Sequence, residues 1–111
     1  MELFKDVLSG GEIIELENKY GNYFKITVDI ELGLIVTGCK LHADAVPLLK
    51  EKGSSENNIW GGWVNLEEKE VETNAVWNIR DKNASMEILD NETRNKFINL
   101  VKRYFSDVFI K

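Results

Sequence analysis

The chain has 111 residues, of which 43% are hydrophobic and 30% are charged. That length fits one domain, and that composition excludes an intrinsically disordered chain. The 14 basic and 19 acidic residues give a net charge of -5 at pH 7, which disfavours nucleic-acid binding because phosphate groups would be repelled. We therefore expect a single domain over residues 1–111 that binds no nucleic acid.

Nothing in the sequence indicates export or a membrane. The single Cys cannot form an internal disulfide. The first residues lack the basic and apolar regions of a signal peptide, and no apolar run approaches the about 18 residues of a membrane helix. We therefore expect a cytoplasmic protein with no membrane partner.

A first helix is predicted over residues 10–20. Ser9 and Glu12 have the spacing of a capping box, in which each side chain binds a backbone amide at the helix start. Gly21 follows the last apolar residue of the helical pattern and can adopt the left-handed conformation that ends a helix.

A β-hairpin is predicted next, over residues 23–31 and 34–40. The first run alternates apolar and polar residues, which is typical of a strand buried on one face. The second run is apolar on both faces, which indicates a central strand. The two runs are separated by a short turn that contains Gly33.

The segment after this hairpin holds the only Cys, the only His and the only Pro of the chain. Cys39 is predicted to lie within the second strand, whose pattern ends at Lys40. Asp44 suits the N-cap of a short helix over residues 45–52, and Pro47 is tolerated in its first turn. His42 should then adjoin a helix N-terminus, whose dipole lowers the pKa of an imidazole.

A second hairpin and a last helix complete the predicted fold. Residues 59–66 and 71–80 have strand patterns, and Asp90 caps a helix that runs to about residue 105 with one apolar face. The order is helix, hairpin, helix, hairpin, helix. We predict an α+β fold, with an antiparallel sheet of about four strands and three helices mainly on one face.

The other face of this sheet is predicted to be polar. One interpretation is an ordinary solvated surface. Another is a binding face on which Arg80 holds an anion and Trp63 provides a contact platform. The alternation places these residues on that face: Tyr23, Lys25, Thr27, Asp29, Trp63, Glu72, Asn74, Asn78 and Arg80.

His42 is the main candidate for catalysis. One interpretation is a hydrogen-bonded junction residue with no further role; the other is an acid or base oriented by Asp44. Cys39 and His42 are too few ligands for a closed zinc site, and no nucleotide or phosphate motif is present. We therefore expect no metal and no cofactor.

Several short motifs resemble those of an uncharacterised family of small prokaryotic proteins, known as a domain of unknown function. The order and spacing match over about residues 10–105. This resemblance implies a prokaryotic, cytosolic protein with the family's fold, and it implies no activity. The motifs are Val28-Asp29-x-Glu31-x-Gly33, Leu41-His42-Ala43-Asp44, Leu48-Leu49-x-x-x-Gly53-Ser54, Trp60-Gly61, Asn78-Ile79-Arg80 and Asn83-x-Ser85.

The polar motifs of this resemblance lie at the junction between each hairpin and the helix that follows it. If the two hairpin–helix units are related by pseudo-symmetry, these two junctions lie near one another. Two alternative functions follow from these observations. The first is a non-enzymatic binding or protein-interaction module, with or without self-association. The second is an enzyme or binding protein for a small anionic metabolite. A pocket shared by His42 and Arg80 would favour the second. The residues that would edge such a pocket are His42, Asp44, Asn78, Arg80, Asn83 and Ser85.

Overall fold

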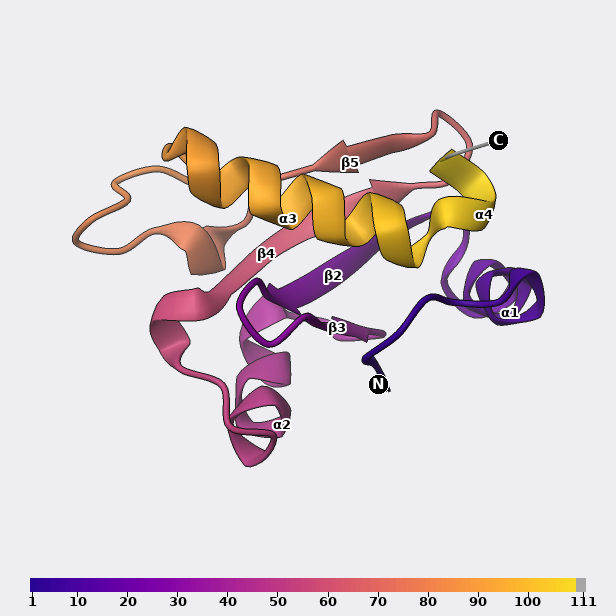
Figure 1. The fold of residues 1–111 in the computed structure, drawn as a ribbon, viewed down its shortest axis with the longest axis horizontal. Helices are drawn as coiled ribbons and strands as arrows, with labels where there is room; N and C mark the ends of the chain where they lie inside the picture. Colours follow the sequence, from indigo (N-terminus) through magenta and orange to yellow (C-terminus); the bar gives the residue numbers. More distant parts are fainter. Residues whose placement is uncertain (110–111) are drawn as a thin grey trace.

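A computed structural model describes residues 1–109 as one five-stranded antiparallel sheet with four helices (Figure 1). The strand order is β1-β3-β2-β4-β5. The strands are β1 (Glu2–Phe4), β2 (Tyr23–Asp29), β3 (Leu34–Thr37), β4 (Ile59–Asn65) and β5 (Glu70–Glu72). The helices are α1 (Gly10–Tyr20), α2 (Val46–Glu51), α3 (Asn91–Tyr104) and α4 (Ser106–Phe109), with 3₁₀ turns η1 (His42–Ala45), η2 (Glu56–Asn58) and η3 (Val76–Asn78).

The predicted fold class is confirmed, with one strand more than expected. Strand β1 was missed because it has only three residues; it pairs with the edge of β3. Helix α1 has the predicted bounds, and Ser9 and Glu12 form the expected capping box. Helix α3 begins after Asp90, whose carboxylate accepts a hydrogen bond from the amide of Thr93.

The larger hydrophobic core lies between the sheet and the helices α1, α3 and α4. Phe97, Val101 and Phe105 are fully buried there against Ile26 and Val28 of β2. Helix α2 packs on the opposite face, where Leu49 meets a smaller cluster that includes Val36 and Ile59. Strand β3 is therefore buried on both faces, as its apolar sequence predicts.

The second hairpin is shorter than predicted. Strand β5 ends at Glu72, and the residues that follow form η3 and a loop instead of continuing the strand to Arg80. Trp77 lies in η3, where its indole nitrogen donates to the carbonyl of Ile59 and its ring packs against the smaller cluster. The physical reason is that buried side-chain amides, described below, bind the backbone of this segment.

Two predictions for the first junction are wrong. Cys39 lies beyond β3, because Gly38 has a φ of 82° and turns the chain after Thr37. The Asp44 carboxylate accepts from the amide of Leu41 and so caps η1, whereas α2 has no side-chain cap. Pro47 does lie in the first turn of α2, as predicted.

Candidate functional site

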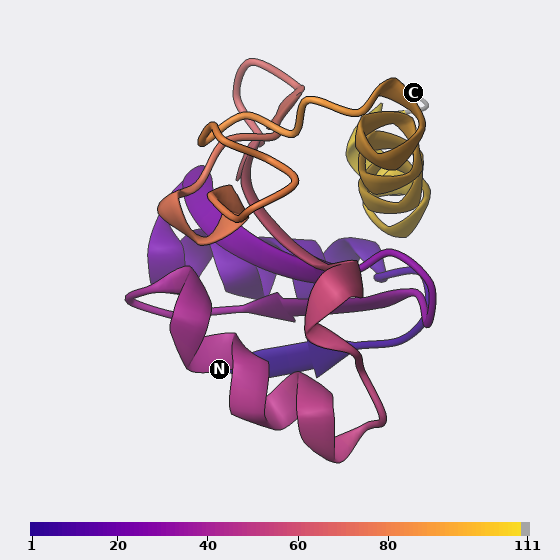
Figure 2. The ribbon, with the colours of Figure 1, turned by 90° about the vertical axis from the view of Figure 1, so that its left-hand side faces the viewer.

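A pocket of about 670 Å³ lies on the sheet face opposite α1 and α3. Its base is formed by β2 and β4, and its walls are η1, η2 and the loop of residues 73–89. The segments η1 and η3 contact each other, on the same side of the sheet (Figure 2). His42 and Arg80 both line this pocket, together with Trp63.

The sequence Trp60-Gly61-Gly62-Trp63 makes the base of the pocket possible. A Cβ atom on Gly61 would lie 2.7 Å from Cδ2 of His42, so only glycine lets the imidazole pack on the strand. A Cβ atom on Gly62 would point to the other face and lie 2.7 Å from Cζ of Phe97. The two glycines therefore bring His42 and α3 close to opposite faces of the same strand.

His42 is buried, with 8% of its surface exposed. Its Nε2 atom lies 2.9 Å from the carbonyl oxygen of Gly62, which can only accept, so the neutral ring carries its proton on Nε2. Burial lowers the pKa of His42, the charge of Lys25 lowers it further, and the bond to Gly62 opposes this. A lowered pKa for His42 was predicted from the sequence, but with a helix dipole as its cause, whereas burial is the leading cause in the structure.

In the part of the chain that the structure describes, no carboxylate is hydrogen-bonded to the imidazole of His42. The expected partner, Asp44, is exposed and bound to the amide of Leu41. Among residues 1–109, no group of three or more His, Cys, Asp or Glu side chains is placed to hold a metal ion.

The guanidinium of Arg80 is engaged with its own protein. It stacks on the ring of Trp60 at 3.8 Å from the ring centre. Its Nη2 donates to the carbonyl of Ile59 at 2.7 Å, and Nη1 lies 3.4 Å from the carbonyls of Glu56 and Asn57. Arg80 thus links η2 to β4. Because its guanidinium is engaged in these contacts, it is poorly placed to bind an anion.

Asn78 and Asn83 lie behind the pocket wall and do not line the pocket. Both are buried, and the Asn83 amide donates to the carbonyls of Asn78, Ser85 and Glu87. The Ser85 hydroxyl accepts from the amide of Glu87. Of the residues expected to edge one pocket, the structure brings together only His42 and Arg80.

An aromatic cluster around Trp63 was only partly foreseen. Tyr23 stacks on Trp63 with 4.8 Å between ring centres, and Nζ of Lys25 lies 4.6 Å from the centre of the Trp63 ring. Burial and a hydrogen bond to Glu72 raise the pKa of Tyr23 to about 12. Tyr23, Lys25 and Trp63 also line a second hollow of about 360 Å³ beside Cys39.

The rim of the pocket is apolar and solvent-exposed. Leu41 and Val76 are 64% and 70% exposed, and Ile79 and Met86 lie beside them. Val76 and Ile79 were not predicted to lie at this rim, because the alternating pattern of residues 71–80 favours a strand, whereas the structure has η3 and a loop there. A large exposed apolar patch around a hollow is typical of a binding surface.

Comparisons with known proteins found one family that matches the chain. This family, described as "Protein of unknown function (DUF5674)", matches residues 2–104. Neither the curated proteins nor the solved structures gave a match. No helix within residues 1–109 has both the length and the apolar character to cross a bilayer.

Proposed function

The chain belongs to this family of unknown function, and we propose that it is a non-catalytic binding module whose pocket holds a small molecule with a largely apolar body. The observation that carries the proposal is the pocket itself. Its volume of about 670 Å³ falls in the range of small-molecule sites. In line with the resemblance, we propose that it acts in the cytoplasm of a prokaryotic cell.

The lining supports binding of an apolar group. Leu41, Val76 and Met86 offer aliphatic or thioether surface, and the rings of Trp63 and Trp77 offer flat surface beside it. Such pockets bind their ligands by removing apolar area from water, while a few polar groups set the orientation.

The polar groups support binding better than catalysis. A catalytic imidazole needs a partner that orients it and a reachable proton, whereas Nε2 of His42 is bound to a backbone carbonyl. Arg80 is held by backbone carbonyls and by Trp60. Neither group is arranged for proton transfer or for stabilising a developing charge.

A thermal-shift screen with two matched variants tests this function. Ala43 is an exposed residue of the pocket wall, and Ala84 is an exposed residue outside it. A ligand of the pocket should raise the melting temperature of the wild type and of Ala84→Phe, because it binds only the folded protein. Ala43→Phe fills the pocket and should abolish the shift. An equal shift in both variants would contradict the proposal.

The exposed apolar rim favours a second candidate, a protein partner that includes a second copy of the chain. A small ligand would leave Leu41, Val76 and Ile79 partly in water, whereas a protein surface would cover them. Sedimentation velocity over a range of protein concentrations tests self-association. A dimer that is lost in Val76→Ser would support this candidate; a monomer at every concentration would argue against it.

A further inference from the structure

The pocket contains a positive charge, that of Lys25, which has no anionic partner among residues 1–109. Resting on the binding function proposed above, we propose that the ligand is an apolar monocarboxylate and that Lys25, not Arg80, binds its carboxylate. The apolar body then occupies the larger pocket, beside Trp63 and the exposed rim.

Lys25 differs from the lysines that form ion pairs. Lys19, Lys50 and Lys96 each bind a carboxylate at the protein surface. Lys25 is half-buried, and within residues 1–109 it forms neither an ion pair nor a hydrogen bond. Its contact is with the ring of Trp63. In a chain with a net charge of -5, an unpaired ammonium in a largely apolar pocket is complementary to an anion.

The position of Lys25 fixes where the carboxylate would lie. Lys25 lines both the larger pocket and the second hollow, and it stands directly across from Trp63 in the pairing of β2 with β4. The nearby carboxylate of Glu72 is bound to the hydroxyl of Tyr23 at 2.7 Å. A ligand anion at Lys25 would therefore sit at the boundary of the two hollows, with its body over the Trp63 side of the pocket.

The number of available donors favours a carboxylate over a phosphate. Phosphate sites commonly combine several donors, often a free arginine fork or a group of backbone amides. Here the arginine fork of Arg80 is bound to backbone carbonyls, which leaves one ammonium in the pocket. A single point charge beside apolar walls matches a single negative charge on an apolar body.

Calorimetric titration with paired probes tests this assignment on the full chain. The probes are octanoate and naphthalene carboxylate, their neutral amides, and octyl phosphate. Each carboxylate should bind the wild type about tenfold or more tightly than its amide, because the amide is neutral and loses the charge–charge attraction to the Lys25 ammonium. Lys25→Met should remove this preference, and Lys25→Arg should retain it.

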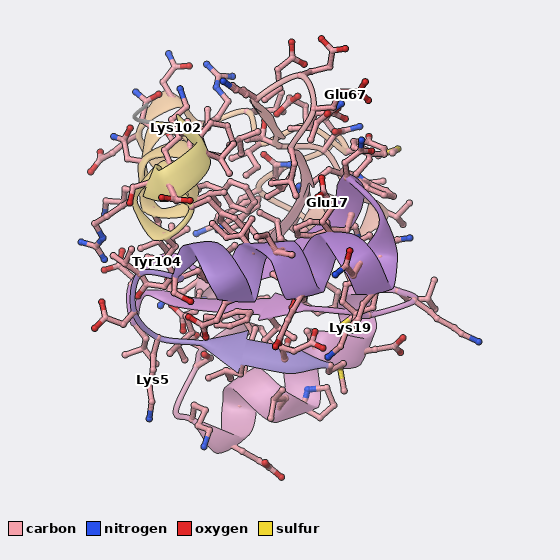
Figure 3. All side chains as sticks on the ribbon, turned by 90° about the vertical axis from the view of Figure 1, so that its right-hand side faces the viewer. Lys5, Glu17, Lys19, Glu67, Lys102 and Tyr104 are labelled. Carbon is pink, nitrogen blue, oxygen red and sulfur yellow. The ribbon has the colours of Figure 1, made fainter. Side chains whose placement is uncertain are left out.

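Lys102→Met is the matched control, since Lys102 lies exposed on α3 (Figure 3) and is not among the residues that line the pocket. It should bind all probes as the wild type does. Circular dichroism melting of each variant checks that it is folded.

The outcomes separate the two proposals. If amides and carboxylates bind the wild type equally, or if octyl phosphate binds more tightly than octanoate, the assignment of Lys25 to a carboxylate is overturned while pocket binding stands. If Lys25→Met still binds carboxylates more tightly than amides, the assignment of Lys25 is overturned as well. If neither acids nor amides bind, the small-molecule function is overturned together with it.

Discussion

The side chain of Asn78 pairs with the backbone of Gly61 as a neighbouring strand would. Its Oδ1 accepts from the Gly61 amide at 2.8 Å, and its Nδ2 donates to the Gly61 carbonyl at 2.9 Å. The same amide also lies 3.0 Å from the carbonyl of Met86. One buried side chain therefore joins β4, the base of the pocket, to the loop that forms its wall.

Replacing Asn78 with Ala should destabilise the protein by about 2–4 kcal/mol, because buried backbone groups of Gly61 lose their partners. Urea denaturation measures this loss. Asn99→Ala, at an exposed position of α3, is the control and should change stability by less than about 0.5 kcal/mol. A similar small effect for Asn78→Ala would show that the loop does not depend on this network.

Two glycine-to-alanine substitutions should change the stability of the protein in opposite directions. Gly61→Ala should cost about 1–3 kcal/mol, because the new methyl group would overlap the His42 ring and the Ala75 side chain. Gly11→Ala should stabilise by about 0.5–1 kcal/mol, since this exposed helical position has room and alanine favours a helix. Thermal unfolding of the two variants checks the pair; a stable Gly61→Ala would mean that the His42 ring is not tightly packed.

Arg80 should behave as a structural residue. Arg80→Lys keeps the charge but loses the stacking on Trp60 and the fork that binds the carbonyl of Ile59, so it should cost about 1–2 kcal/mol. Arg103→Lys on α3 is the control, because its exposed side chain lies 5.3 Å from the ring of Tyr104 and makes a weaker contact. If Arg80→Lys keeps full stability and loses ligand affinity, Arg80 belongs to the binding site after all.

His42 should make stability depend on pH in the acidic range. Its pKa is lowered in the folded protein, so between that value and about 6.5 the unfolded state binds more protons. Its contribution is complete above pH 6.5 and is lost as the pH falls through this window. NMR titration of the ring should give a midpoint below 6.5, and His42→Gln should remove this part of the pH dependence. A raised midpoint would indicate a carboxylate partner and favour the catalytic alternative.

Local signals allowed α1 and β2 to be predicted from the sequence. The bounds of α1 follow from Ser9, Glu12 and Gly21, and β2 follows from strict alternation. The segment after β5 was not predicted, because its conformation depends on two buried amides. That of Asn78 binds the distant backbone of Gly61, and that of Asn83 binds carbonyls within the loop itself, such as that of Glu87. Hydrogen bonds of this kind, from a side chain to the backbone, leave no periodic pattern in the sequence.

Only the approximate location of the candidate site could be inferred from the sequence. The junction motifs left open whether His42 and Arg80 share a pocket, and in the structure both side chains line the same one. Their roles could not be predicted, because these depend on the backbone carbonyls that each side chain meets in the folded chain. Lys25 was predicted to lie on the polar face, but only the three-dimensional structure shows that no carboxylate within residues 1–109 pairs with it.

The most direct test of the binding function is an NMR titration of the indole N–H signals with octanoate. Trp63 lines the pocket, whereas Trp60 is buried on the other face of β4, in the larger core. Binding in the pocket predicts a saturable shift of the Trp63 signal with little change at Trp60. An unchanged Trp63 signal at saturating octanoate, or a shift confined to Trp60, would contradict it.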